Sequence, residues 1–212
     1  MKIIDLSHPI SENIPTYFDD KKPFLQVIGD VAEYGHREMD IAYNSHIGTH
    51  IDLPAHMIMN GKTIDKTKIE KYFGKGIKIN VANVYPNKIL RKYLSKFQAE
   101  IRKVDFVLLH SGYGKYWGRK KYFSGFPTLE TDAAEWLCDF KIKGIGIDMI
   151  SIDSTDSVDY INHKIFFKNE ILIIENLTNL DKIPDKIFYF SCLPLNIKNA
   201  DGSPIRAVAV IV

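Results

Sequence analysis

The chain has 212 residues, of which 45% are hydrophobic and 25% charged, and its formal net charge is +2. This composition is typical of a folded globular protein and excludes an intrinsically disordered chain. So small a net charge offers no broad basic face, and we therefore expect neither a nucleic-acid nor a membrane partner.

The chain length fits one domain spanning residues 1–212, without an internal repeat or linker. The amino end, MKIIDLSHPISENIP, lacks the long apolar core of a secretion signal, and no run of about 18 apolar residues is present. We therefore expect a cytoplasmic protein.

Cys138 and Cys192 show no CxxC spacing, so we expect two core thiols, and any metal must be held by nitrogen and oxygen ligands.

Short runs of apolar and β-branched residues predict eight strands along the chain. Two of these runs, DFVLLH and ILIIEN, are apolar almost throughout, which favours strands that are buried on both faces. The predicted strands span residues 2–6, 37–52, 76–84, 105–110, 144–148, 171–176, 187–195 and 206–212.

Helices are fewer than strands. The clearest spans 131–141, where apolar residues recur at helical spacing from Ala133 onward and form a stripe that must lie on a sheet. Weaker helical patterns cover 66–73 and 87–97, and the pattern over 161–168 is ambiguous. Together these elements predict an α/β fold, with a mixed sheet covered by a few helices.

The strongest functional signal is the stretch NSHIGTHIDLPAH, residues 44–56. His46, His50 and Asp52 share the same parity, so along a strand their side chains would face one way. A straight strand would hold His46 and His50 about 13 Å apart, at roughly 3.3 Å per residue, which is too far to share an ion. A bend is therefore required, and Gly48 is the residue that tolerates one.

A helical HxxxH arrangement, as in zinc protease helices, is the alternative geometry. Gly48 and the β-branched Thr49 inside that turn, and Pro54 just after it, disfavour a helix. On a helix Asp52 would also lie on a different face from His46. A kinked strand therefore fits the pattern better.

Two imidazoles and one carboxylate are suitable ligands for zinc or manganese, and they leave positions open for water. The predicted site is catalytic in type, because a structural zinc site would be closed and cysteine-rich. His56 follows Pro54 and could hang over the site, where a general acid or base would protonate a leaving group. A role for His56 as a third ligand is the alternative.

The array H-x-G-T-H-x-D-x-P-x-H resembles the signature of the cyclase family of metal-dependent hydrolases, which includes bacterial kynurenine formamidase (arylformamidase) and isatin hydrolase. The resemblance extends along nearly the whole chain. DLSHPISENIP precedes the signature, and GIDMISID, HKIFFKNEILIIENLTNLDKIP and PLNIKNADGSPIRAVAV follow it in the family's order. The resemblance implies a swivelling β/β/α fold for the predicted α/β domain.

The resemblance also implies that the second half of the site comes from His163 and Glu175, which the residues alone would not single out. It implies two divalent ions, with zinc expected and manganese the alternative, since both accept imidazole and carboxylate ligands. In the family arrangement Asp52 and Glu175 bridge the two ions. The implied metal ligands are His46, His50, Asp52, His163 and Glu175.

The implied activity is hydrolysis of the C–N bond of a small amide, an N-formylkynurenine-like aryl formamide or a related cyclic amide. A metal-bound hydroxide would attack the carbonyl, with His56 as general acid or base. Tyr17 stands where the family carries an aromatic substrate contact and is a candidate pocket wall. The alternatives are a lactone or imide hydrolase, a ring-closing cyclase on the same metal centre, and a metal-dependent binding protein without turnover.

The segment SGYGKYWGRKKYFSGFP, residues 111–127, interleaves aromatic and basic residues. Its glycines would suit a lid, and a pocket wall or dimer contact is more plausible than a nucleic-acid contact on this nearly neutral chain. The family resemblance implies a homodimer or homotetramer.

Overall fold

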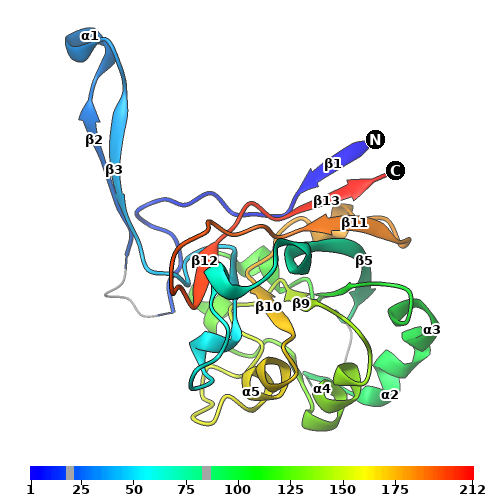
Figure 1. Cartoon of the computed structure of the whole chain (residues 1–212). Coiled ribbons are helices and arrows are strands. Elements are labelled where there is room, and N and C mark those ends of the chain that lie inside the picture. The colour runs from blue at the N-terminus through cyan, green and yellow to red at the C-terminus, as the bar shows by residue number, and fades with distance from the viewer. Residues whose placement is uncertain (18–21, 83–86) are drawn as a thin grey trace.

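The computed structural model describes residues 1–17, 22–82 and 87–212. Its main feature is a curled nine-stranded sheet, in which the first and last strands of the chain lie side by side (Figure 1). In spatial order the strands are β1 (Lys2–Asp5), β13 (Val208–Ile211), β11 (Phe188–Ser191), β5 (Phe73–Asn80), β7 (Phe106–His110), β9 (Gly144–Ile147), β10 (Leu172–Glu175), β4 (His50–Asp52) and β12 (Gly202–Pro204).

The middle of the sheet is parallel and its two flanks are antiparallel. Strands β5, β7, β9 and β10 pair in parallel, whereas β4 and β12 on one flank and β11, β13 and β1 on the other pair antiparallel. Alternate side chains of β7 enter two separate cores: Val107 and Leu109 pack on the helical side, and Phe106 and Leu108 on the other. This strand and β10 are buried on both faces, as the apolar runs predict.

Helices cover one face of the central strands (Figure 1). The α-helices are α1 (Val31–Tyr34), α2 (Arg91–Leu94), α3 (Gln98–Ile101), α4 (Thr131–Cys138) and α5 (Ile161–Lys168). Short 3-10 turns span Pro54–His56, Ile64–Lys66, Ile69–Tyr72, Ser95–Phe97, Tyr113–Tyr116, Lys120–Phe123 and Leu180–Lys182. A minor parallel pair joins β6 (Lys88–Ile89) to β8 (Thr128–Leu129).

An antiparallel hairpin of β2 (Phe24–Gly29) and β3 (Glu38–Ala42), with α1 at its tip, projects away from the rest of the molecule (Figure 1). We call residues 24–42 the arm. The sequence analysis did not predict β2, because the polar and glycine-containing tip of the arm interrupts the alternation that marks a strand.

The predicted α/β fold with a mixed sheet and a few helices is confirmed. The continuous strand over 37–52 is wrong, because β3 and β4 are separated by a loop. The helix over 66–73 is wrong as well: 3-10 turns occupy it, and β5 begins at its end. The ambiguous segment 161–168 is helix α5.

Smaller differences concern the ends of elements. The predicted helix 131–141 ends at Cys138, and the pattern over 87–97 contains β6, α2 and a 3-10 turn. The last two residues of the predicted strand 76–84 lie outside the described residues.

Cys192 is buried in the core and Cys138 is half-buried, both as free thiols. Over the described ranges, no helix is long and apolar enough to cross a membrane.

Candidate metal centre

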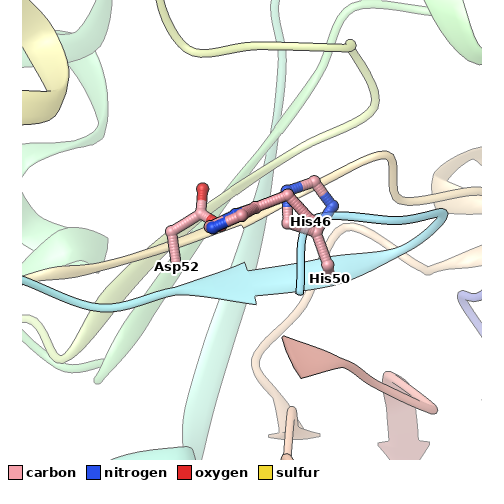
Figure 2. Close-up of side chains that lie close together, drawn as sticks. All are labelled: His46, His50 and Asp52. Atoms are coloured by element: carbon pink, nitrogen blue, oxygen red, sulfur yellow. The ribbon is translucent and has the colours of Figure 1, made fainter. Parts of the chain in front are cut away.

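The first half of the centre is built on strand β4. His50 and Asp52 are one strand repeat apart on β4, so both side chains point to the same side of the sheet. His46 approaches from the preceding loop, and its Nδ1 lies 2.6 Å from Oδ1 of Asp52. Figure 2 shows the two imidazoles and the carboxylate gathered on one side of the strand. We call this group the β4 half.

Two glycines allow His46 to take this position. Gly48 adopts a φ of +60°, a conformation that other residues rarely adopt, and so makes the bend that the sequence required. Gly202 on β12 lies under the ring of His46: a Cβ there would stand 2.7 Å from Cε1 of His46. The bend thus replaces the straight-strand separation of the two histidines with rings whose centroids are 5.3 Å apart.

The second half of the centre comes from β10 and α5. Glu175 is the last residue of β10 and is in register with His50 on the neighbouring β4. His163 reaches in from α5, and its Nε2 lies 3.5 Å from Oε1 of Glu175. Donor atoms of Asp52, His163 and Glu175 all lie within 4.8 Å of one another. We call His163, Glu175 and the partner of His163, Asp153, the α5 half.

Hydrogen bonds orient His163 and His50 toward the centre. Nδ1 of His163 lies 2.7 Å from Oδ2 of Asp153, a carboxylate that also accepts the backbone N–H of Asn162 and of His163. Nδ1 of His50 lies 2.9 Å from the carbonyl oxygen of Gly48 and can donate to it. In each case Nε2 is left to face the carboxylates, which is the arrangement found for histidines that bind metals.

The two central carboxylates are buried side by side. Burial and the neighbouring Asp52 raise the pKa of Glu175 well above its usual value, although the backbone N–H of Ile152 donates to it. Burial opposes ionisation of Asp52 too, but His50 and His46 outweigh it and hold the pKa of Asp52 well below its usual value. Such a concentration of acidic groups in a buried site suits cations and is costly without them.

Asp201, just before β12, joins His46 to His56. Its Oδ2 lies 2.8 Å from Nε2 of His46 and 3.2 Å from Nδ1 of His56. Burial alone would lower the pKa of His46, but Asp52 and Asp201 outweigh it and raise that pKa to about 10. The bonds from His46 and His56 hold the pKa of Asp201 well below its usual value.

A cavity of about 610 Å³ opens above these imidazoles and carboxylates. Tyr17 forms part of its wall, and its hydroxyl donates to the carbonyl oxygen of Thr155 at 3.3 Å. Burial, together with the neighbouring Tyr160, raises the pKa of Tyr17 to about 12, so Tyr17 lines the cavity as a neutral phenol. Its other lining residues include Asn44, Ser45, Met57, Ile150, Lys164 and Asn176.

The segment 111–127 contacts Asn176, one of the residues that line this cavity. Tyr122 is fully buried, and its hydroxyl donates to Oδ1 of Asn176 at 2.9 Å. The amide of Asn176 in turn donates to the carbonyl oxygen of Gly48 at 2.9 Å. The segment therefore stabilises the bend that positions His46, a structural contribution that its aromatic and basic pattern did not indicate.

The structure thus brings together all the predicted site residues: Tyr17, His46, His50, Asp52, His56, His163 and Glu175 all line the same cavity. Their roles are proposals treated below. Sequence reasoning missed Asp153 and Asp201, although both lie in stretches that carry the family resemblance. An aspartate that holds a histidine has no local pattern, since the two are ten residues apart in one case and 145 or more in the other.

Comparison with known proteins places this chain in one family. A family profile described as "Putative cyclase" matches residues 4–154. Kynurenine formamidase of Bacillus anthracis is 34% identical over 209 residues, which cover 98% of this chain and 96% of that protein. An uncharacterized protein of Methanocaldococcus jannaschii is 34% identical over 212 residues, the full length of both chains.

Solved structures agree at the level of the fold. A structure described as a predicted metal-dependent hydrolase from Bacillus stearothermophilus has a TM-score of 0.82 at 27% identity, over 98% of this chain and 97% of that chain. Isatin hydrolase A from Ralstonia solanacearum has a TM-score of 0.88 at 21% identity, over 99% of this chain and 92% of that chain.

The chain belongs to the cyclase family. The resemblance seen in the sequence is confirmed, and with it the class of enzyme, a hydrolase.

Proposed function

We propose that the protein is a metal-dependent hydrolase of small amides, with an N-formylkynurenine-like aryl formamide or a related cyclic amide as substrate. One observation carries the proposal: three imidazoles and two buried carboxylates from separate elements converge beneath a cavity of about 610 Å³. The similarity of the whole chain to kynurenine formamidase of Bacillus anthracis supports the substrate class.

The donor set fits divalent cations. Two carboxylates and three histidine nitrogens are hard and intermediate ligands, suited to zinc or manganese, and no thiol takes part. The buried acid pair of Asp52 and Glu175 lies against the imidazoles of His46, His50 and His163. We propose two ions per subunit, zinc in the first instance with manganese as the alternative. Their ligands would be His46, His50, Asp52, His163 and Glu175.

Divalent ions bound there would lower the pKa of water and polarise a substrate carbonyl. The chain's own contribution to the chemistry is proton transfer and positioning. His56 lies between the two halves, with ring centroids 3.9 Å from His46 and 6.2 Å from His163. The carboxylate of Asp201 accepts a hydrogen bond from Nδ1 of His56, which leaves Nε2 to deliver a proton to the leaving nitrogen. His56 thus acts as general acid or base.

The cavity wall favours a flat, partly apolar substrate. Tyr17 and Tyr160 present aromatic rings, and Met57 and Ile150 add apolar surface. An aryl ring stacked between such walls would hold its amide carbonyl over the carboxylates. Tyr17 is the substrate contact that we propose.

Product analysis on a substrate panel tests the proposal. Zinc-loaded and manganese-loaded protein would be incubated with N-formylkynurenine, other N-formyl arylamines, isatin and aryl lactones, and the products identified by mass spectrometry. We expect metal-dependent release of formate from an N-formyl arylamine, with Glu175→Gln as the inactive control. Turnover of lactones alone would favour a lactonase, and metal binding without turnover of any compound would favour a binding protein.

A further inference from the structure

The charged side chains that line the cavity differ in depth. Imidazoles and buried carboxylates form its floor. Lys164 is the one lysine or arginine among the described lining residues, and its side chain is exposed to solvent. Its ammonium pairs with no carboxylate in the part of the chain that the structure describes. Lys164 therefore offers an uncompensated positive charge to a molecule that enters the cavity.

Helix α5 places Lys164 in a row with two other cavity residues. Tyr160 is the N-cap of α5, and His163 and Lys164 follow it three and four residues later. At this spacing the three side chains share one face of a helix, with His163 and Lys164 on either side of Tyr160. The backbone N–H of Lys164 donates to the carbonyl oxygen of Tyr160 at 3.1 Å and closes the first turn. The row thus runs from an imidazole at the floor, past an aromatic ring, to an ammonium.

Tyr160 is held in this row in a strained conformation. Its φ of +48° and ψ of 51° are left-handed, a region in which bulky residues are rare. Its N–H donates to Oγ of Ser157 at 3.1 Å, and its ring stands edge-on to that of His163, with centroids 6.1 Å apart. Strain of this kind collects at binding sites, where the surrounding structure holds a side chain ready for a ligand. The ring of Tyr160 is thus a fixed wall between the floor and Lys164.

We propose that Lys164 binds a carboxylate carried by the substrate, at the end of the molecule away from the amide bond. The inference rests on the proposed function and narrows its substrate class to anionic aryl amides. The reacting carbonyl would lie at the floor beside His163, the aryl ring against Tyr160 and the carboxylate at Lys164. A neutral cyclic amide would use only the first two of these positions. Lys164 is therefore a specificity-determining residue.

The exposure of Lys164 sets the size of the effect. Water competes for an exposed ion pair, whereas a hydrogen bond between an ammonium and a carboxylate is stronger than a neutral one. Between these limits we expect Lys164 to favour an anionic substrate by about five- to tenfold. The contact is remote from the reacting atoms and is the same in the ground and transition states. The preference should therefore appear in KM rather than in kcat.

Two substrates of similar size and different charge test the inference, 4-formamidophenylacetate and its neutral primary amide. Zinc-loaded wild type should show the lower KM for the acid. Lys164→Met should raise the KM of the acid to that of the amide, and Lys164→Arg should restore most of the difference. Lys168→Met is the matched control, because it removes the same charge from α5 one turn further on, at a residue that does not line the cavity. It should keep the preference.

Binding of the product 4-aminophenylacetate, measured by titration calorimetry, needs no turnover. Its affinity for zinc-loaded protein should fall about five- to tenfold in Lys164→Met and not in Lys168→Met. Protein that hydrolyses neither formamide but shows this difference would refute the proposed function and leave Lys164 as an anion-binding residue.

Three results would overturn the inference. Wild type could show no preference for the acid, or the two lysine variants could lose it equally, in which case only the overall charge matters. A preference that survives in Lys164→Met would mean that the floor of the cavity binds the carboxylate instead.

Discussion

The β4 half of the centre takes His46, His50 and Asp52 from seven consecutive residues, whereas the α5 half takes its groups from a loop, a helix and a strand end. The first is formed by one bent stretch of backbone. The second exists only after α5 has packed on the sheet beside β10. Local geometry therefore sets one half, and tertiary packing sets the other.

The two halves also differ in their contact with solvent. The side chain of His46 is 23% exposed, while those of His163 and Glu175 are 4% and 6% exposed. In the β4 half His46 is the member that contacts water, since the side chains of His50 and Asp52 are 5% and 1% exposed. The α5 half is buried throughout. Substitutions in the two halves should therefore differ in whether they alter the chemistry or the packing.

The largest effect is expected from Glu175→Gln, because Glu175 links the halves: its carboxylate lies 3.5 Å from His163 and 3.7 Å from His50. We propose Glu175 as a ligand that two ions share, and losing such a ligand costs several kcal/mol, so kcat/KM should fall by about a thousandfold or more. Metal content by mass spectrometry should fall with it. The metal-free variant should melt at or above the wild-type temperature, because burial already penalises the carboxylate of Glu175. Retained turnover would remove Glu175 from the centre.

His56→Ala is expected to have the next largest effect, and on chemistry alone. General acid catalysis contributes about 10²–10⁴-fold, so kcat should drop by that order while metal content and KM change little. His56→Gln serves as a control for packing, because it keeps a polar side chain of similar reach next to Asp201. If instead metal content fell in parallel with activity, His56 would be a third ligand, the alternative that the sequence left open.

The same contrast explains what could be predicted from the sequence. His46, Gly48, His50 and Asp52 form a local pattern whose parity and bend follow from strand geometry. His163 and Glu175 carry no such pattern and were reached only through family resemblance. The strand over 37–52 was wrong because one run of β-favouring residues contains two strands with different partners, β2 and β10. Pairing between distant segments leaves little trace in a single sequence.

A smaller and more selective effect is expected from the two aspartates that hold histidines. Asp153→Asn weakens the orientation of His163, and Asp201→Asn that of His46 and His56. Replacing a residue that hydrogen-bonds to a metal-binding histidine typically weakens metal affinity by about 10–100-fold. Titration with zinc should show binding that is about 10–100-fold weaker at the α5 half for Asp153→Asn. Only Asp201→Asn should also change the pH profile of kcat, since only Asp201 contacts His56. Identical behaviour of the two variants would show that the halves act as one unit.

The smallest effect concerns the metal-free protein, whose stability should fall as pH rises. Asp52 and Asp201 outweigh burial and raise the pKa of His46 from 6.5 to about 10. The resulting stabilisation is complete below about pH 6.5 and is lost as pH rises toward 10. The raised pKa of Glu175 has the same sign, because its protonated form is the one that burial favours.

Thermal unfolding of chelator-treated protein between pH 6.5 and 9 should therefore show a Tm that falls by a few degrees, since 1 kcal/mol shifts the Tm of a chain this size by about 2–4 °C. Zinc must displace the same protons, so its affinity should rise with pH and widen the Tm gap between loaded and metal-free protein. His46→Asn should flatten the pH dependence of the metal-free Tm and of the zinc affinity, because it removes the imidazole that exchanges a proton with water. A metal-free Tm that climbs with pH would mean that these carboxylates do not hold a proton on His46, and that the β4 half is not the proton-exchanging side of the centre.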